Sequence, residues 1–480
     1  MWLKLHKPEL LEKFQLSEFE KHLMEQGNEV ESYARNLFPG GIEVVSTGED
    51  ACHETTRLMV SKVSTIFQAT FIVDGFIARN DMLVHDPNTD HWDLYEVKAT
   101  NSVKENTSER DHIDDLAFQF SVLKRAGVSV GKCFLVHMNK EYVRHGDLDI
   151  HTLFIIEDET EKVLAKLPEM EKNMELARDY LTQEKEPVGN CECLYKGRRN
   201  HCTTFKHSNS HVPDYSVHDL SYVTKKKLDM FIEKGVFDLA DVTEEFDITD
   251  NQRNQVLVHQ RQKPIIDKGA IKEVLDSLSF PLYFFDYEAY GPAIPAFDGY
   301  SPYKRIPFQF SLHVLKTPTS ELEHVEFLHD KLTDPSEEVA KVLKEHIMPG
   351  GTVIAWHKSY EAGVNKEIGA RLPEYASLFE SMNNSLYDLK EIFSKQLYIH
   401  HDFKGKSSIK KVLPAIIPDL RYSDLDIREG GQAADSWWTM VSPSTTAEEK
   451  AKINKDLKTY CGMDTFAMYK IWEHLKDVIG

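Results

Sequence analysis

A run of apolar residues that ends in two carboxylates limits the possible fold more than any other segment of this sequence. Residues 281–288 are Pro-Leu-Tyr-Phe-Phe-Asp-Tyr-Glu, so an extended segment here is apolar on both faces until Asp286 and Glu288. A strand that is apolar on both faces is typical of the centre of a sheet that helices cover on both sides. Period-two alternation places Asp286 and Glu288 on one face, where they can bind divalent cations. We therefore expect an α/β fold with a metal site at the end of this strand.

The length of the chain predicts more than one domain. At 480 residues it exceeds the usual size of a single domain, and strand and helix signals are mixed in both halves. We predict a first α/β domain over residues 1–213, a helical connector over residues 214–278 and a second α/β domain over residues 279–480. Within the connector, residues 226–242, with Gly235 at the turn, are compatible with a helix-hairpin-helix or with a plain two-helix linker.

Patterns of apolar residues locate the other elements. In the first half we expect strands at residues 69–73, 81–85, 92–98, 133–138 and 152–156, and helices at residues 29–37, 113–124 and 159–183. In the second half we expect further strands at residues 308–314 and 352–356, and a long closing helix that is capped by Thr445 with Glu448 three residues later.

Composition bounds the class of protein. A hydrophobic fraction of 41% with 28% charged residues is typical of globular chains, and no apolar run approaches the roughly 20 residues of a membrane-spanning helix. The N-terminal residues carry charges where a signal peptide would be apolar, so we expect a cytoplasmic protein. The net charge of -21 argues against a broad basic surface for duplex DNA, although a local basic groove remains compatible with it.

A first group of candidate catalytic residues lies in the first half. Glu96 and Lys98 share a face of one expected strand, and Asp81 lies in the preceding strand, one β-turn upstream. Two carboxylates can hold Mg²⁺ or Mn²⁺, and the lysine can position an attacking water or stabilise developing negative charge. An acidic residue two positions from a lysine is also common on any exposed strand, which is the structural alternative.

This arrangement resembles the D…ExK motif of the PD-(D/E)XK nucleases. Gln119, in a following helix, stands where RecB-like members carry a glutamine, and Glu31 stands where they carry a metal-binding histidine. The resemblance implies a restriction-endonuclease-like fold in which Asp81, Glu96 and Glu31 bind the metal while Lys98 and Gln119 assist catalysis. For Glu31, an ordinary solvated helix turn is the alternative.

Three of the six cysteines lie in one short loop, at Cys191, Cys193 and Cys202. Such a group suggests a metal or cluster site, and both zinc and iron–sulfur clusters need four ligands. His201 or His207 is a candidate for the fourth ligand of a zinc site.

The order of these motifs resembles the iron–sulfur RecB-like nucleases, including the CRISPR-associated and AddB-type members. In that group a fourth cysteine precedes the nuclease core, and residues 1–4 are similar to the segment that directly follows it. The resemblance implies a [4Fe–4S] cluster whose first ligand is missing from this sequence, with Cys52 and Cys133 as poorly placed substitutes.

The closing helix carries a second group of candidate catalytic residues. Asp464 interrupts an apolar stripe that includes Leu457, Cys461 and Met468. A buried, unpaired carboxylate is costly, so Asp464 needs a partner or a metal ion. Tyr460 lies one helical turn earlier, close to the same face.

Tyr460-x-x-x-Asp464, taken with Asp286 and Glu288, resembles the tyrosine-type DEDD exonucleases of the DnaQ-like group. The resemblance implies a ribonuclease H-like fold in which the three acidic residues bind metal and the tyrosine orients the attacking water. Glu361 stands where the middle motif of that group has an aspartate, which implies that it is a further metal ligand.

A local basic run follows the middle motif. Lys406, Lys410 and Lys411 are candidates for holding the phosphates of a nucleic acid near the second site. A run of solvated lysines is the alternative.

The combination resembles a bacterial family of unknown function in which a RecB-like domain precedes a DnaQ-like domain. It implies a nuclease with Mg²⁺ or Mn²⁺ in both sites that acts on DNA, or on RNA, in exonucleolytic end-processing for repair or defence. Three alternatives stay open: one active nuclease domain beside a degenerate nucleic-acid-binding domain, a non-enzymatic binding scaffold, and hydrolysis of free nucleotides. Nucleic acid, DNA before RNA, is the expected partner, and the scaffold of the second alternative would bind nucleic acid or a partner protein.

Overall fold

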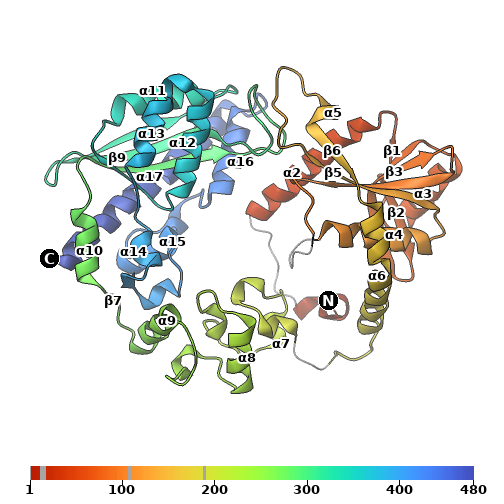
Figure 1. The fold of residues 1–480 in the computed structure, drawn as a ribbon, viewed down its shortest axis with the longest axis horizontal. Helices are drawn as coiled ribbons and strands as arrows, with labels where there is room; N and C mark the ends of the chain where they lie inside the picture. Colours follow the sequence, from red (N-terminus) through yellow and green to blue (C-terminus); the bar gives the residue numbers. More distant parts are fainter. Residues whose placement is uncertain (1, 11–17, 106–110, 188–190) are drawn as a thin grey trace. The chain divides into compact units, whose positions relative to one another are not determined.

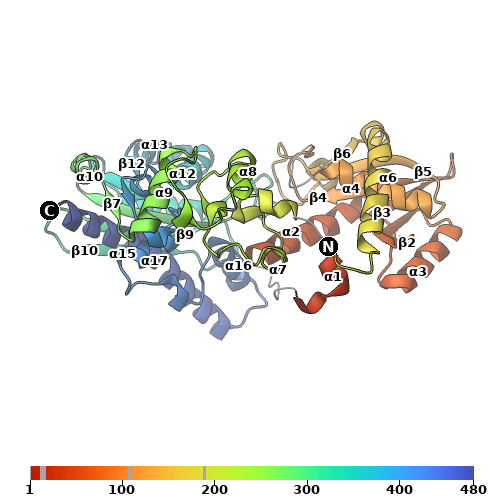
Figure 2. The ribbon, with the colours of Figure 1, turned by 90° about the horizontal axis from the view of Figure 1, so that it is seen from below.

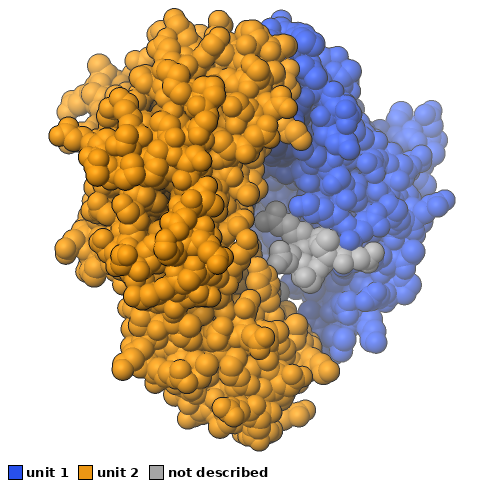
Figure 3. Space-filling view, turned by 60° about the vertical axis from the view of Figure 1, so that its left-hand side comes forward, with its two compact units in different colours: residues 1–6, 20–187, 291–304 blue, residues 7–19, 188–290, 305–480 orange. Residues whose placement is uncertain are grey.

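The computed structural model describes residues 2–10, 18–105, 111–187 and 191–480. The chain divides into two compact units, and each unit gathers segments that are distant in the sequence (Figures 1 and 3). Unit 1 takes residues 1–6, 20–187 and 291–304, and unit 2 takes residues 7–19, 188–290 and 305–480. No helix in the described part of the chain combines the length and the apolar character that crossing a membrane requires.

The boundaries of these two units differ from the boundaries of the three predicted domains. The cysteine loop and the connector belong to unit 2, whereas residues 291–304 belong to unit 1. Arg144 holds this segment, because its Nη1 donates to the carbonyl oxygens of Pro295 and Ala296 at 2.9 and 2.8 Å. Such a long-range contact leaves no periodic pattern in the sequence.

Unit 1 is built on a mixed sheet with strand order β1-β2-β3-β4-β5-β6. β2, β3 and β4 form an antiparallel meander, and β5 lies parallel to β4 and antiparallel to β6. The strands are β1 (Ile42–Glu43), β2 (Thr65–Val73), β3 (Phe76–Asp86), β4 (His91–Lys98), β5 (Val130–Met138) and β6 (Phe154–Asp158). The helices are α1 (Trp2–His6), α2 (Glu18–Ala34), α3 (Gly48–Val60), α4 (His112–Arg125), α5 (Ile150–Leu153) and α6 (Thr160–Leu181).

Alternating strand residues divide the core of unit 1 between the two faces of its sheet. Ile66 and Leu83 pack in a core with residues of α3, α4 and α6. Phe67 and Met82, their sequence neighbours, pack in another core with residues of α2. Because α4 covers the first of these faces, it can bring polar side chains to the β3–β4 pair.

Unit 2 is built on a second mixed sheet, with strand order β10-β9-β8-β11-β12. β9 is antiparallel to both of its neighbours, whereas β11 is parallel to both β8 and β12. The strands are β8 (Leu282–Tyr290), β9 (Ile306–Leu315), β10 (Leu322–Leu328), β11 (Thr352–Ala355) and β12 (Leu386–Asp388), with β7 (Ile265–Ile266) and β13 (Tyr398–Ile399) paired apart from them. The helices are α7 (Phe205–Ser208), α8 (Lys225–Glu233), α9 (Asp250–Arg261), α10 (Lys268–Asp276), α11 (Ser336–His346), α12 (Ser359–Arg371), α13 (Ala376–Asn384), α14 (Glu391–Ser394), α15 (Ile409–Ile416), α16 (Gly430–Val441) and α17 (Ala447–Ile479).

The central position expected for the apolar strand is confirmed by β8. Tyr283, Phe285 and Tyr287 pack in a core with side chains of α11, α12 and α13. Phe284, on the other face, contacts Tyr469 of α17 with 5.7 Å between ring centroids. Helices therefore cover both faces of this sheet, with α12 and α13 on one side and α17 on the other (Figure 2). The α/β class is confirmed for both units.

Three local expectations are wrong. Leu239–Asp241 form a single 3-10 turn instead of the second helix of a helix-hairpin-helix, because Asp238 is extended, pairs with Ser216 and caps the turn. The strand expected from residue 152 begins at Phe154, since the Asp149 side chain caps α5 just before it.

The third error concerns the start of α17. Thr446, not Thr445, is the N-cap, and it forms a capping box with Glu449. The Thr445 hydroxyl donates instead to the carbonyl of Thr439 at 2.5 Å, so the cap is shifted by one residue.

Candidate functional site

Three carboxylates meet at β8. Asp286 and Glu288 lie on this strand, and Asp464 lies on α17, which covers the same face of the sheet. One oxygen of each carboxylate lies within 4.8 Å of the other two. Among the described residues, no lysine, arginine or histidine forms an ion pair with any of the three. The structure thus brings together three acidic residues that the sequence analysis assigned to one site, although the first and the last are 178 positions apart in the sequence.

Burial and mutual repulsion raise the pKa values of this trio. For Asp286 and for Glu288, burial is the largest cause of a pKa well above the usual value, and the charge of Asp464 is the next. Burial also raises the pKa of Asp464, to about 6, against hydrogen bonds from Tyr422 and Tyr460. A divalent cation would favour the ionised form of all three groups.

Two tyrosines and a lysine border the trio. The Tyr422 hydroxyl donates to Asp464 Oδ1 at 2.5 Å. Lys410 Nζ lies 5.6 Å from the ring centre of Tyr422 and 5.4 Å from that of Tyr460. The charge of Lys410 lowers the pKa of each carboxylate in the trio, although burial outweighs it. Tyr460 was expected here from its spacing, whereas Tyr422 was missed because it lies in a three-residue 3-10 helix, which is too short to give a spacing signal.

Glu361, on α12, is a fourth carboxylate of this region. It does not belong to the group within 4.8 Å, but its charge contributes to the raised pKa values of Asp286 and Glu288. Burial, with the charge of Asp388 adding to it, raises the pKa of Glu361 to about 8. Its Oε2 is buried without a hydrogen-bond partner among the described residues. A buried oxygen without a hydrogen bond is costly, so Glu361 is better suited to bind a cation than to belong to a complete hydrogen-bond network.

Asp388 is a residue that the sequence analysis missed. It ends β12 beside the end of β11, and its carboxylate accepts the backbone N–H groups of His357 at 2.9 Å, Lys358 at 3.3 Å and Lys390 at 3.1 Å. Those bonds hold the turn that leads into α12, where His357 has a φ of 78°. Asp388 therefore helps to position Glu361 without reaching the trio itself.

The residues predicted for the first site also meet, around the β3–β4 hairpin. The N–H of Val97 donates to Asp81 Oδ2 at 2.8 Å, and Lys98 Nζ donates to Glu96 Oε1 at 2.7 Å. Gln119 of α4 donates to the other carboxylate oxygen of Glu96 at 2.7 Å. Strand pairing and one helix thus bring four of the expected side chains together.

Two further polar residues complete this first group. Gln68 Nε2 donates to Glu31 Oε1 at 2.6 Å and to Asp81 Oδ1 at 3.3 Å. Gln68 has a φ of 57°, and the β2–β3 ladder skips it. Asp115 accepts a hydrogen bond from Lys98. Its position four residues before Gln119 on α4 is a signal that could have found it, whereas the backbone turn at Gln68 leaves none.

The acidic groups of the first site already have protein partners. Lys98 pairs with Glu96, and Arg35 pairs with Glu31 at 2.7 Å. Burial raises the pKa of Asp81 well above its usual value and raises that of Glu96 as well, although the charge of Lys98 opposes the second shift. No group of three ligand atoms within 4.8 Å occurs here among the residues described.

Cys191, Cys193 and Cys202 lie close enough to share one ion. Their sulfur atoms lie within 4.8 Å of one another, with 3.9 Å between those of Cys191 and Cys202, and none forms a disulfide. Cys133 is buried in the core of unit 1, and Cys52 lies on α3, so neither belongs to this group.

The candidate histidines do not join these thiols. His201 Nε2 is 3.0 Å from the carbonyl oxygen of Lys196, and its ring stacks on Phe205. Neither His201 nor His207 is within the 4.8 Å group. The described residues therefore supply three ligands to this candidate centre.

The three candidate phosphate-binding lysines separate in the structure. Lys410 lies beside the carboxylate trio, Lys406 lines a cavity of unit 2, and Lys411 is exposed on α15. The basic run is therefore not one continuous patch.

Residues 283–408 match the model of a protein family described as "Domain of unknown function (DUF2779)". Over 249 residues the chain is 25% identical to the "Uncharacterized protein UU173" of Ureaplasma parvum serovar 3, an alignment that covers 48% of this chain and 34% of that protein. Over 235 residues it is 26% identical to the "Uncharacterized protein MG366 homolog" of Mycoplasma pneumoniae, covering 45% of this chain and 35% of that protein.

These alignments span about a third of the length of the curated relatives. No solved structure matches the chain. The matched family segment contains Asp286, Glu288 and Glu361 and ends before Lys410 and Asp464. The chain is therefore similar to this family over the part of unit 2 that supplies Asp286 and Glu288 of the carboxylate trio, and Glu361 beside it.

Proposed function

We propose that unit 2 is a metal-dependent nuclease that hydrolyses phosphodiester bonds of nucleic acid, DNA in the first instance. One observation carries the proposal: three carboxylate oxygens, from two buried residues and the half-buried Asp286, lie within 4.8 Å of one another with no ion-pair partner in the described chain. Buried charge without compensation is strongly unfavourable, so such a cluster points to a bound cation.

The donor set suits Mg²⁺ or Mn²⁺. Both are hard cations that prefer oxygen ligands. Asp286, Glu288 and Asp464 would hold the metal, with Glu361 as a further ligand through its unpartnered oxygen. When bound, such an ion neutralises charge on a phosphoryl group and lowers the pKa of an attacking water.

Side chains around the trio supply the other needs of hydrolysis. Tyr460 is proposed to orient the attacking water through its hydroxyl. Lys410 is proposed to contact a phosphate of the substrate, because its ammonium group borders the trio without an ion-pair partner in the part of the chain described. Tyr422 holds Asp464 in place by its hydrogen bond.

The topology of unit 2 supports a finer assignment. The ribonuclease H-like fold has a five-stranded sheet in which one strand beside the central strand is antiparallel to the other four. The sheet of unit 2 has the order β10-β9-β8-β11-β12, with β8 at the centre and β9 as the antiparallel strand. We propose that unit 2 has this fold, and that the site is of the DnaQ-like DEDD type. Function still has to be argued from the site, because one fold serves many reactions.

A second nuclease-type site is proposed in unit 1. Asp81 and Glu96 lie on neighbouring strands, with Lys98 bonded to Glu96 and Gln119 supporting it. These contacts support a site of the PD-(D/E)XK type, with the RecB-like glutamine in α4. Glu31 is proposed as a peripheral ligand, since it already pairs with Arg35.

The three clustered thiols are proposed to bind zinc or an iron–sulfur cluster in unit 2. Thiolates are good ligands for both, and the three sulfur atoms are already gathered. Metal analysis of the anaerobically purified protein tests this, with the Cys193→Ser variant as the comparison. Equal zinc and iron contents in the two proteins would contradict a site at these thiols.

Cleavage of end-labelled DNA and RNA, single- and double-stranded, tests the nuclease proposal. The assay would be run with Mn²⁺, with Mg²⁺ and with EDTA. We expect metal-dependent cleavage by the wild-type protein and its loss in Asp464→Ala. The Lys98→Ala variant tests the site in unit 1 in the same assay.

The outcomes separate the alternatives. Cleavage that only one of these two variants abolishes indicates one active site beside a degenerate binding domain. Absence of cleavage together with binding that EDTA leaves unchanged would indicate a binding scaffold. Hydrolysis of free nucleotides in preference to polymers would move the substrate class to small molecules.

A further inference from the structure

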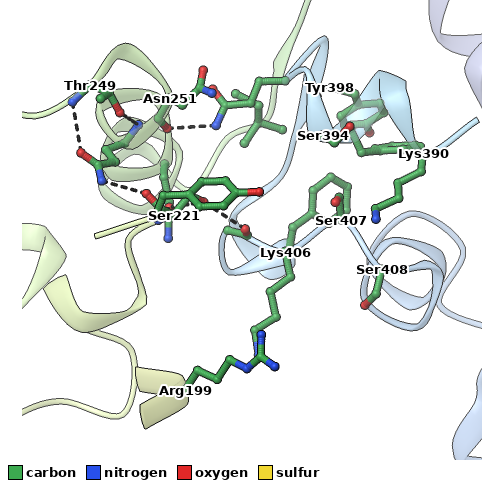
Figure 4. Close-up of a pocket in the computed structure, with 18 residues that line it drawn as sticks. Arg199, Ser221, Thr249, Asn251, Lys390, Ser394, Tyr398, Lys406, Ser407 and Ser408 are labelled. Atoms are coloured by element: carbon green, nitrogen blue, oxygen red, sulfur yellow. Dashed lines mark hydrogen bonds between the residues drawn. The ribbon is translucent and has the colours of Figure 1, made fainter. Parts of the chain in front are cut away.

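A cavity of about 790 Å³ lies in unit 2, outside the carboxylate trio (Figure 4). Residues from the connector, near the start of α9, form one wall, and the segment from Lys390 to Ser408 forms the other. This volume is in the range of pockets that hold small ligands or parts of larger ones.

The charge of this cavity differs from that of the chain. Arg199, Lys390 and Lys406 line it, and no aspartate or glutamate does, although the chain has a net charge of -21. None of the three basic side chains has an ion-pair partner among the residues that the structure describes. Lys406 and Arg199 point toward one another (Figure 4). Like charges that converge without a counter-charge indicate that the cavity receives an anion.

The two walls are joined by contacts that pre-form the cavity. The hydroxyl of Ser221 donates to the carbonyl of Gly405 at 3.2 Å, and its N–H donates to Gln255 Oε1 at 3.0 Å. A Cβ at Gly405, where φ is 72°, would lie 2.4 Å from the Gln255 amide. A residue with a side chain at this position would therefore push the walls apart.

Polar and aromatic groups complete the lining. The side chains of Ser407 and Ser408 supply hydroxyl groups beside the basic residues. Tyr222, at a φ of 51°, is 99% exposed and also lines the cavity. An aromatic ring that is free on both faces can stack on a base, and such stacking is tolerant of sequence.

The cavity is linked to the carboxylate trio by a short stretch of chain. Lys406, Ser407 and Ser408 line the cavity, and Ser408 is the N-cap of α15. Lys410, two residues later, borders Tyr460. One continuous backbone segment therefore presents cations both to the cavity and to the trio.

We propose that this cavity binds the phosphodiester backbone of a single-stranded nucleic acid, with a base stacked on Tyr222. This inference rests on the proposed function, because it names the form of substrate that unit 2 would receive. The combination of unpaired cations, hydroxyl groups and an exposed aromatic ring is the one that binds single strands without reading their sequence. A duplex would need a broad basic surface, which the acidic chain makes unfavourable.

Binding in EDTA tests the cavity apart from catalysis. Fluorescence anisotropy would be measured with labelled oligonucleotides of about 16 nucleotides, as single-stranded DNA, single-stranded RNA and duplex DNA. Relative to the wild-type protein, we expect at least about tenfold weaker single-strand binding by Arg199→Ala/Lys406→Ala, with the salt dependence reduced by about 1.4 units of slope. For Tyr222→Ala we expect about fivefold weaker binding with an unchanged salt slope.

The matched control is Lys331→Ala/Lys341→Ala, which removes the same charge from exposed positions that do not line the cavity. It should bind like the wild-type protein, and thermal unfolding of all variants should show that they fold. Equal losses in the control and the cavity variant, equal or tighter binding of duplex, or no binding by the wild-type protein would each overturn the proposal. Cavity-dependent binding without any cleavage would support the cavity and reject the nuclease, so the two failures are distinguishable.

Discussion

The two carboxylate sites of this chain differ in the partners that their acidic side chains have. In unit 1, Glu96 is held by Lys98 and Gln119, and Asp81 accepts hydrogen bonds from a backbone N–H and from Gln68. In unit 2, the carboxylates face one another with no ion pair in the described chain, and Tyr422 donates to only one of them.

This difference indicates how much each site would be stabilised by a bound cation. A carboxylate that a lysine and an amide already satisfy gains less from a metal ion than one whose nearest charges are negative. Burial is the largest cause of the raised pKa of both Glu96 and Asp286, but the next cause differs: the charge of Lys98 opposes the shift at Glu96, whereas the charge of Asp464 adds to the shift at Asp286. Unit 2 is therefore the stronger candidate for metal binding. The predictions on cleavage, on stabilisation by a cation and on the metal-free protein can break or sharpen this contrast, and a further prediction concerns the acid stability of unit 2.

The largest expected effect is on cleavage. Asp286→Asn should lower the rate of metal-dependent cleavage by at least about a hundredfold, since even partners outside the direct ligand shell of a metal contribute about tenfold to a hundredfold. Asp81→Asn is the matched change in unit 1, and the rate lost in each variant measures how the two sites share the activity. Full activity of Asp286→Asn, with loss only in Asp81→Asn, would reverse the contrast.

The second effect is stabilisation by a divalent cation. At a free metal concentration about 100 times the Kd, binding to the native state should stabilise the protein by about 2.7 kcal/mol. We expect Mn²⁺ to raise the Tm of the wild-type protein and of Glu96→Gln, and to raise that of Glu288→Gln much less. Equal rises in the Tm of the two variants would show that Mn²⁺ does not bind preferentially to the carboxylates of unit 2.

The third effect concerns acid, through a buried polar layer beneath α17. His313 Nδ1 lies 2.8 Å from Thr465 Oγ1, its ring stacks on His324, and burial lowers the pKa of His313 to about 4. Because the unfolded state takes up its proton near pH 6.5 and the folded state only near pH 4, the contribution of His313 to stability is full above pH 6.5 and is lost toward pH 4.

Chemical unfolding at pH 7 and pH 5 measures this loss. We expect His313 to lower the free energy of unfolding by about 2 kcal/mol between these pH values, against the opposite contribution of the carboxylates whose pKa values are raised. The His313→Gln variant should lack this contribution, so its free energy of unfolding at pH 5 relative to pH 7 should be higher than that of the wild-type protein. Emission from tryptophan reports mainly on unit 2, where Trp356, Trp437, Trp438 and Trp472 lie. If the variant has the same pH dependence as the wild-type protein, this polar layer is not a source of acid sensitivity.

The smallest effect is on the metal-free protein. In EDTA, Glu288→Gln should raise the free energy of unfolding by about 1 kcal/mol, because it removes one charge from a repulsive buried cluster. The isosteric Glu96→Gln should instead lower it by about 1 kcal/mol, since Lys98 loses one of its two acidic partners. Urea unfolding of both variants measures the signs, and equal signs would refute the proposed difference between the sites.

Much of the architecture was predictable because it depends on local patterns. The apolar residues before Asp286 predicted a central strand, and alternation along β4 placed Glu96 and Lys98 on one face. The polar interruption of an apolar helical stripe located Asp464 on the buried side of α17. Each of these signals repeats within a few residues, so it survives in a single sequence.

The sequence by itself determined which residue types could form these sites and on which element each lies. Only the tertiary structure decided which of them meet: Tyr422 with Asp464, Gln68 with Glu31, and residues 291–304 with unit 1. The physical reason is that backbone periodicity is a property of neighbouring residues, whereas these contacts depend on the packing of segments far apart in the chain. Such packing leaves no spacing in the sequence from which the contact could be predicted.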